Sequence, residues 1–288
     1  MSRSLCFVTA TAASFALVAP SASAAPIVLS DGFQIGGTGL NTNVNADLAT
    51  RQSGTAAPLT LAEATAGTSP NNDAFIQNDF GAFGSDALLL RTTASPGGGA
   101  NQTAVQVGGL GAVIGTQYTI SFDYHMSFAS GAGNARFLGF TLSGDTAAAT
   151  PGGDFAIVLR ENGDQTTFED GTATGAPNVP YSTSGGEVST IQLLVDETLA
   201  TPTVTVTLSD TFGTDTATLA PVAIDFEAAD TGRFLEIRGS QSGGTTFGGS
   251  VGDFRIDNLQ VEIVPEPSTA ALAAAGAGLM LLRRRSAR

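Results

Sequence analysis

Three residues whose types could carry out hydrolysis lie at alternate positions of one segment: Asp123, His125 and Ser127. Serine hydrolases use these residue types together, with the serine presented on a sharp turn and each side chain bonded to the next. Alternate residues of a strand lie about 6.5 to 7 Å apart, so the three form a row, and no such turn surrounds Ser127. We interpret the row as the solvated polar face of a strand with one ordinary histidine.

Paired carboxylates offer a second route to hydrolysis. Some retaining glycosidases carry Glu-x-Asp-x-x-Glu on one strand, which gives two carboxylates the spacing needed for displacement, and no such string occurs here. The acidic pairs Glu161 with Asp164 and Glu169 with Asp170 lie in Gly-rich, turn-like sequence, where solvated charge is expected. We therefore predict no catalytic residues and a protein that is not an enzyme.

Glycan binding is the alternative that the residues leave open. Sugar sites usually combine a flat aromatic ring with hydrogen-bonding side chains, and this chain has no Trp and three Tyr. Tyr118 and Tyr124 fall on the apolar face of a strand, which predicts that they are core residues. Tyr181, in a loop-like segment, is the candidate glycan contact.

The composition limits the possible partners and metals. Removing Arg3 and the four tail arginines leaves seven of the 12 basic residues against 26 acidic ones, a net charge of about −19. Nucleic acid is then excluded as a partner, because phosphate binding needs clustered cations. A single histidine excludes a two-histidine metal site, and Cys6, the only cysteine, precedes most of the N-terminal apolar run. The mature protein therefore has no disulfide.

Short segments of period two fill residues 25–264 and predict an antiparallel β-sandwich of jelly-roll type. The clearest runs from Tyr118 to Phe128, and Asn162-Gly163 predicts a tight turn. From Gly36 to about Pro70 the sequence is polar and irregular, which is typical of a long loop. Weaker alternation of apolar residues marks further strands at Phe155, Ile157 and Leu159; at Ile191, Leu193 and Val195; at Val204, Val206 and Leu208; and at Val222, Ile224 and Phe226.

The last predicted strand changes phase. Phe254 and Ile256 share one parity, whereas Leu259, Val261 and Ile263 share the other. A β-bulge near Asp257-Asn258 would absorb the extra residue.

The N-terminus is typical of a secretory signal peptide. Residues 1–24 contain Arg3, an apolar run from Leu5 to about Ala19, and a small-residue site at Ala22 and Ala24. This pattern predicts a signal helix, export by Sec-type machinery and cleavage before Ala25.

The C-terminus, residues 265–288, has three parts in order. Pro265, Glu266 and Pro267 are followed by an uncharged stretch at 268–282 and then by Arg283, Arg284, Arg285 and Arg288. As a helix the stretch is roughly 22 Å long, and a comfortable membrane span needs ~30 Å. The arginines should stay in the cytoplasm and stop transfer there. We expect a short transmembrane helix that holds the protein only temporarily.

This order of features resembles the PEP-CTERM family of sorted proteins, over about the last 24 residues. The resemblance implies that an exosortase-type membrane protease recognises Pro265, Glu266 and Pro267 and removes the tail. It also implies a final location at the cell surface or in the extracellular matrix of a Gram-negative-type bacterium. A plain C-terminal membrane anchor is the alternative. We thus expect an exported, noncatalytic surface or matrix protein, with a glycan-binding module as the second choice and a polysaccharide hydrolase as a distant third.

The segment from Asp253 to Glu262 resembles the terminal strand of concanavalin-like, carbohydrate-binding jelly rolls. Such domains often bind a structural calcium ion with an Asp of that strand, a place that Asp257 occupies here. Asp31, just before the first strand-like run, would lie nearby if the chain ends pair. Calcium prefers oxygen ligands, which carboxylates and amides supply. The alternative is that Asp257 and Asn258 only satisfy local backbone donors.

Overall fold

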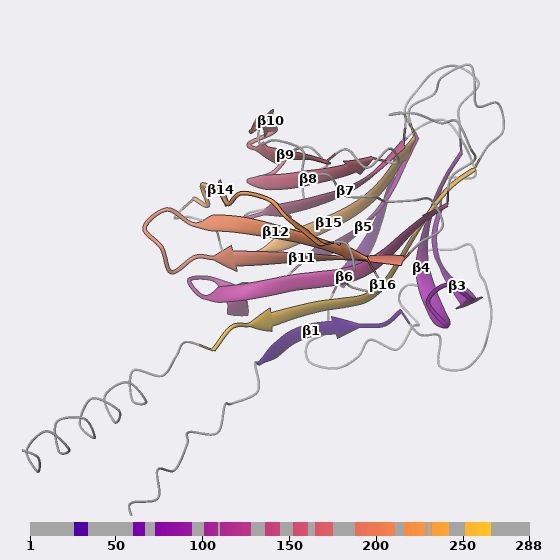
Figure 1. Cartoon of the computed structure of the whole chain (residues 1–288), viewed down its shortest axis with the longest axis horizontal. Coiled ribbons are helices and arrows are strands. Elements are labelled where there is room, and N and C mark those ends of the chain that lie inside the picture. Colours follow the sequence, from indigo (N-terminus) through magenta and orange to yellow (C-terminus); the bar gives the residue numbers. More distant parts are fainter. Residues whose placement is uncertain are drawn as a thin grey trace, which may run out of the picture. The chain divides into compact units, whose positions relative to one another are not determined.

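The computed structural model describes residues 26–33, 60–66, 73–93, 101–108, 110–127, 136–144, 152–160, 165–174, 188–210, 216–227, 230, 232–241 and 251–265. Ala25–Val264 forms one compact unit. Its strands form two antiparallel sheets (Figure 1). The prediction of an all-β, antiparallel chain is therefore confirmed, and the arrangement is consistent with a jelly-roll sandwich.

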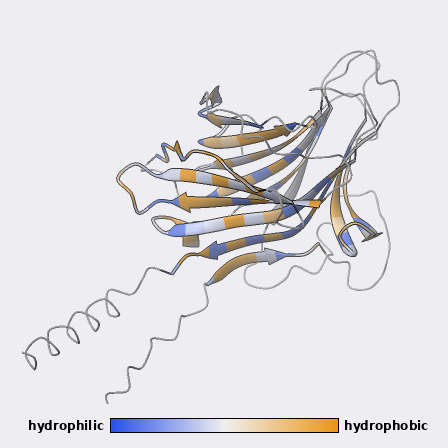
Figure 2. Cartoon of the chain, in the orientation of Figure 1, coloured by the Kyte–Doolittle hydropathy of each residue, from blue (hydrophilic) through white to orange (hydrophobic). Residues whose placement is uncertain are grey.

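The larger sheet contains nine strands, in the order β13-β12-β11-β6-β16-β4-β3, with β1 paired to β16 and β14 to β12. Along β6 and β12 apolar and polar residues alternate, so each of these two strands presents one apolar face (Figure 2). The members are β1 (Ile27–Asp31), β3 (Asp73–Phe80), β4 (Ser85–Thr93), β6 (Gln117–Ser127), β11 (Val188–Asp196), β12 (Thr203–Asp210), β13 (Thr216–Thr218), β14 (Val222–Ala223) and β16 (Val251–Ile263).

The smaller sheet contains seven strands, in the order β10-β9-β8-β7-β15-β5-β2. Strand β15 lies between β7 and β5 although it is far from both in sequence, so a crossover places it there. The members are β2 (Thr60–Ala66), β5 (Asn101–Gly108), β7 (Arg136–Ser143), β8 (Phe155–Arg160), β9 (Gln165–Glu169), β10 (Thr172–Ala173) and β15 (Phe234–Gln241).

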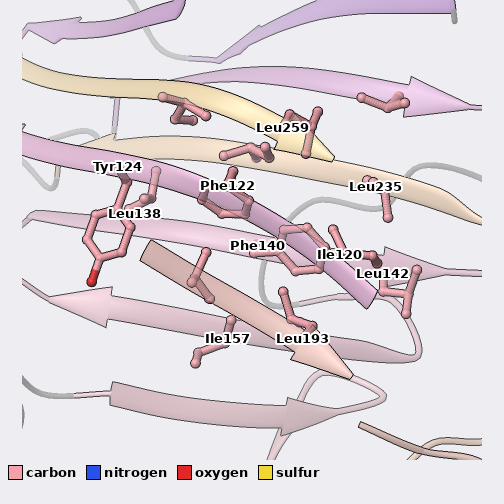
Figure 3. Close-up of a cluster of buried hydrophobic side chains, with 14 of the residues drawn as sticks. Ile120, Phe122, Tyr124, Leu138, Phe140, Leu142, Ile157, Leu193, Leu235 and Leu259 are labelled. Atoms are coloured by element: carbon pink, nitrogen blue, oxygen red, sulfur yellow. The ribbon is translucent and has the colours of Figure 1, made fainter. Parts of the chain in front are cut away.

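The core lies between the sheets. Phe122 of β6 and Phe140 of β7 stack across it with ring centroids 5.9 Å apart (Figure 3). Tyr118 and Tyr124 are 0% and 1% exposed, which confirms the prediction that they are core residues. Burying such apolar faces stabilises the fold by roughly 25 cal/mol per Å² of apolar surface removed from water.

The predicted bulge is confirmed. In β16, Asp257 pairs with Asp123 of β6 and Gln260 pairs with Ser121, so one extra residue of β16 lies between the pairs. Asn258 takes up the irregularity with φ of +52°, a conformation that Asn tolerates better than most residues. The bulge turns Leu259 and Val261 back to the buried face.

Other sequence expectations were wrong in detail. The loop predicted from Gly36 to Pro70 contains β2, whose small, weakly alternating residues conceal the period of two. The strand predicted at Val222–Phe226 is reduced to β14, because after Ala223 the chain bonds to Pro202 through the Ile224 N–H rather than to a longer partner strand.

The expected terminal helices, at the signal peptide and at 268–282, lie outside the described residues. Among the residues that are described, no helix has the length and hydrophobicity that a membrane span needs. The helical element found there is the single 3-10 turn Gly111–Val113.

Candidate functional site

The outward face of the seven-stranded sheet carries charged side chains at its middle. Leu235 and Ile237 of β15 point into the core, so Glu236 and Arg238 point away from it. Both are nevertheless buried, and Arg238 Nε donates to Glu236 Oε1 at 2.6 Å. A buried ion pair is retained only when its geometry and hydrogen bonding are good.

Two glutamines of β5 complete this arrangement. Gln106 lies directly across from Glu236 and donates from Nε2 to Glu236 Oε2 at 2.7 Å. Gln102 accepts from Arg238 Nη1 through Oε1. We call Gln102, Gln106, Glu236 and Arg238 the Glu236 network. Because the buried ion pair holds one atom of each amide, it fixes the orientation of both glutamines.

Glu236 is the single carboxylate of the Glu236 network. Hydrolysis by displacement needs two carboxyl groups about 5 to 5.5 Å apart, or about 6.5 to 9.5 Å apart for inversion. The cross-strand neighbours of Glu236 are Gln106 and Thr141, and neither is acidic. The Glu236 carboxylate is also held in an ion pair with Arg238.

The structure brings together the two residues predicted to bind calcium. Strands β1 and β16 pair, with Asp31 opposite Leu259, next to the bulge at Asp257. Asp31 is the last residue of β1, not a residue before the first strand as predicted. Burial raises the pKa of Asp257, opposed by its bonds to Ser85 and Asn258 and reinforced by the carboxylates of Asp123 and Asp31.

The oxygens of these carboxylates have donors within the protein. Asp257 accepts from the Asn258 N–H at 2.7 Å and from Ser85 Oγ at 2.6 Å, and Asp31 Oδ1 accepts from the Phe33 N–H at 2.8 Å. This is the local hydrogen bonding given above as the alternative. Within the described part of the chain, no three His, Cys, Asp or Glu side chains could together hold a metal ion. Calcium at Asp31 and Asp257 stays a prediction.

The row of Asp123 and His125 on β6 differs from expectation. Asp123 accepts from Thr190 Oγ1 at 2.5 Å and from Asn258 Nδ2 at 2.9 Å, so its carboxylate is engaged with neighbouring strands. His125 is 6% exposed and contacts the edge of Phe80, with ring centroids 4.9 Å apart. The interpretation of this face as solvated was therefore wrong at His125, because Phe80 at the end of β3 packs against its ring.

Several predicted sites lie outside the described residues. These are Tyr181, the proposed cleavage site at Ala22, Ala24 and Ala25, the motif residues Glu266 and Pro267, and the arginines Arg283, Arg284, Arg285 and Arg288. Pro265 is described and exposed. It follows directly on Val264, whose N–H donates to Gln117 O at 2.8 Å.

Sequence reasoning missed the Glu236 network. The segment Leu235-Glu-Ile-Arg238 alternates apolar and charged residues, which was the available signal for a strand with a charged outward face. The glutamines of β5 offered no comparable signal, because polar residues of a half-buried strand are ordinary.

No family model matches the sequence, and no curated protein matches it significantly. Among solved structures, the chain is similar to lectin II from Ulex europaeus, with 10% identity, TM-score 0.46, and 70% of this chain and 92% of that chain covered. It is similar to peanut lectin, with 13% identity, TM-score 0.45, and coverage of 73% and 100%. It is also similar to an endo-1,3-beta-glucanase from Streptomyces sioyaensis, with 16% identity, TM-score 0.48, and coverage of 86% and 100%. Similarity at this level carries no conclusion about ligand or activity.

Proposed function

We propose that this chain is an exported, noncatalytic protein of the cell surface or extracellular matrix, sorted through its C-terminal tail. The observation that carries the proposal is where the folded domain ends. The backbone of β16 stays hydrogen-bonded up to Val264, through Ile263 N–H to Pro26 O at 3.0 Å and Val264 N–H to Gln117 O. The motif Pro265-Glu266-Pro267 begins at the next residue.

This position suits recognition by a membrane protease. Pro265 has no N–H and cannot donate a further backbone hydrogen bond after that of Val264, so the bonded backbone ends there for a chemical reason. Pro265 is also exposed. A protease could therefore reach Pro265 without unfolding the sandwich. Ile27 pairs with Glu262, so the two ends of the domain lie side by side at one sheet position.

Replacing Pro265, Glu266 and Pro267 together by Ala tests the proposal in the native host. The expected result is a heavier, uncut protein retained in the inner membrane, measured by fractionation and mass spectrometry of the intact chain. Glu262→Ala, which removes a nearby carboxylate inside β16, is the matched control and should be cut normally. A triple variant that still loses its tail and reaches the surface would refute the proposal.

A second function, contact with an extracellular polysaccharide, is favoured by the Glu236 network. Gln102 has its amide N–H groups as donors once Oε1 accepts from Arg238, and Gln106 has its amide oxygen as acceptor. Both glutamines are half-buried on the outward face, whereas the ion pair beneath them is buried. They lie four positions apart on one strand, about 13 Å, which suits an extended polymer.

A polysaccharide array with the secreted protein tests this second function. Binding that is weakened in Gln102→Ala and Gln106→Ala would support it. Tyr181→Ala tests the candidate glycan contact that was predicted from the sequence. Thr207→Ala, on the other sheet, is the control. A reducing-sugar assay on any bound polysaccharide tests the noncatalytic assignment, which measurable turnover lost in a carboxylate variant would overturn.

A further inference from the structure

A second pair of carboxylates meets at one end of the seven-stranded sheet, away from Asp31 and Asp257. Asp154 directly precedes β8, and its Oδ2 accepts from the backbone N–H of Gly144 at 2.7 Å. Gly144 directly follows β7. Strands β7 and β8 are paired, with Leu142 opposite Phe155, so the two backbones hold Asp154 beside Gly144.

Asp230 reaches the same glycine from the chain before β15. A Cβ atom placed on Gly144 would lie 1.8 Å from Asp230 Oδ2 and 3.0 Å from Oδ1. The Asp230 carboxylate therefore packs against the Gly144 backbone, and only glycine leaves room for it. Burial raises the pKa of Asp154, opposed by its bond from Gly144, and the carboxylates of Asp230 and Asp170 raise it further. The negative charges thus lie close enough to repel one another.

Asp230 differs from Asp31 and Asp257 in having an oxygen that accepts no hydrogen bond. Its side chain is 7% exposed, and within the described residues Oδ2 has no hydrogen-bond partner. The guanidinium of Arg233 lies 4.0 Å from Oδ2, which makes a long ion pair without a hydrogen bond. That guanidinium donates instead to both oxygens of Glu197 and to Gly232 O.

Ser143, the residue before Gly144, has a buried hydroxyl that also lacks a hydrogen-bond partner among the described residues. Ser143 is the last residue of β7 and is 2% exposed, and its Oγ has no hydrogen-bond partner in the described part of the chain. A Cβ on Gly153, the residue before Asp154, would lie 2.4 Å from this oxygen. Two buried oxygens without hydrogen-bond partners therefore lie at this end of the sheet. One belongs to Ser143, next to Gly144 in the chain, and the other to Asp230, which packs against Gly144.

Buried oxygens of this kind are costly unless something compensates them. A carboxylate taken out of water without a partner is strongly destabilised, and a second carboxylate nearby adds repulsion. A divalent cation removes both penalties at once. Calcium accepts six to eight oxygen ligands from carboxylates, backbone carbonyls and water, with flexible geometry.

We infer that Asp154 and Asp230 bind a divalent cation of the calcium type, with backbone carbonyls and water as the remaining ligands. Bound there, the cation would link the start of β8 to the chain that enters β15. This site is independent of the proposed sorting and of the Glu236 network. The affinity expected of an extracellular module is a dissociation constant of about 10⁻⁴ to 10⁻³ M.

Calorimetric titration of the chelator-treated, purified protein with CaCl₂ tests the inference, together with the thermal midpoint at each calcium concentration. Asp230→Asn should weaken binding by about tenfold or more, because it removes one charged ligand. It should still fold, since Asn is close to Asp in size and the ion pair that it removes, with Arg233 at 4.0 Å, is a long one. Asp154→Asn supplies a second test. Asp257→Asn is the comparison variant: it keeps both Asp154 and Asp230, so it should retain the calcium binding that Asp230→Asn loses.

Three other outcomes would contradict the inference. No heat and no midpoint shift with CaCl₂ would mean that water or a shared proton satisfies these oxygens, and the inference would be wrong. Binding lost in Asp257→Asn and kept in Asp230→Asn would place the cation at Asp31 and Asp257 instead. A midpoint shift of equal size in all three variants would indicate nonspecific screening of the acidic surface, which also overturns the site.

Discussion

The guanidinium of Arg233 forms a two-pronged ion pair with Glu197, from Nε to Oε1 and from Nη2 to Oε2, each at 2.7 Å. Both side chains are 4% exposed. Glu197 directly follows β11 of the nine-stranded sheet, whereas Arg233 directly precedes β15 of the seven-stranded sheet. Tyr118 of β6 donates its hydroxyl to Glu197 Oε1 at 2.9 Å. The pair therefore joins the two sheets at one end of the sandwich.

Arg233→Met should destabilise the protein by about 3 to 5 kcal/mol, because it leaves the Glu197 carboxylate buried without its partner. Urea unfolding measures the effect. Arg160→Met, which removes a half-buried guanidinium bonded to the Thr166 hydroxyl, is the control, with an expected cost below about 1 kcal/mol. Adding Glu197→Leu to Arg233→Met should recover much of the lost stability. Equal effects of the two arginine changes would contradict this role.

Gly239→Ala should destabilise the fold through overpacking between the sheets. A Cβ at Gly239 of β15 would lie 2.4 Å from Phe254 Cδ2 of β16, closer than carbon atoms can approach. Phe254 is fully buried and cannot move aside cheaply. The expected cost is about 1 to 3 kcal/mol. Gly81→Ala, where no atom lies within 4 Å of the new Cβ, is the control for the loss of glycine itself. If both variants unfold at the same urea concentration, the close packing is not as described.

Asp257 should make stability fall as pH rises. Burial raises the pKa of Asp257 in the folded state, so the protonated carboxyl group stabilises the fold. This stabilisation is fully present below the ordinary Asp pKa of about 3.9, and it is lost as the pH rises through the folded-state pKa. In the presence of chelator, Asp257→Asn should flatten this part of the pH profile. A profile unchanged by Asp257→Asn would show that the group is not buried as described.

Asp196 should have the opposite effect on how stability depends on pH. A hydrogen bond from the Thr198 hydroxyl lowers the pKa of Asp196. Its contribution is therefore present above the ordinary Asp value and is lost as the pH falls through the folded-state pKa. Asp196→Asn should remove a small stabilisation at neutral pH and none in acid. Unfolding of Asp257→Asn and Asp196→Asn at neutral and at acidic pH distinguishes the two aspartates. If the change in stability depended on pH in the same direction for both variants, the assignment would be contradicted.

Asn258 provides a test of the bulge. Its φ of +52° strains most side chains, and its Nδ2 also donates to Asp123 Oδ2 at 2.9 Å. Asn258→Gly keeps the backbone conformation and loses only the side-chain bond, whereas Asn258→Ala loses both. The alanine variant should be less stable than the glycine variant by about 1 kcal/mol. The reverse order in thermal unfolding would mean that β16 is regular at this point.

Much of the fold could be predicted from the sequence because burial on one face of a strand imposes a period of two. That period located β6, β8, β11 and β12, and it identified Tyr118 and Tyr124 as core residues. A change of parity within Phe254–Ile263 located the bulge, since only an extra residue can return Leu259 to the buried face. Where side chains are small, as in β2, the same signal disappears.

The candidate sites were decided by tertiary structure. A period of two shows which face of a strand is buried, but it contains nothing about which strand lies beside it. Crossovers placed β15 between β7 and β5, which set Glu236 opposite Gln106 and Arg233 against Glu197. The meeting of Asp154 and Asp230 depends on Gly144 leaving room between segments distant in sequence. The alternating pattern determined the strands of this protein, whereas its charged clusters follow from the order in which two sheets assemble those strands.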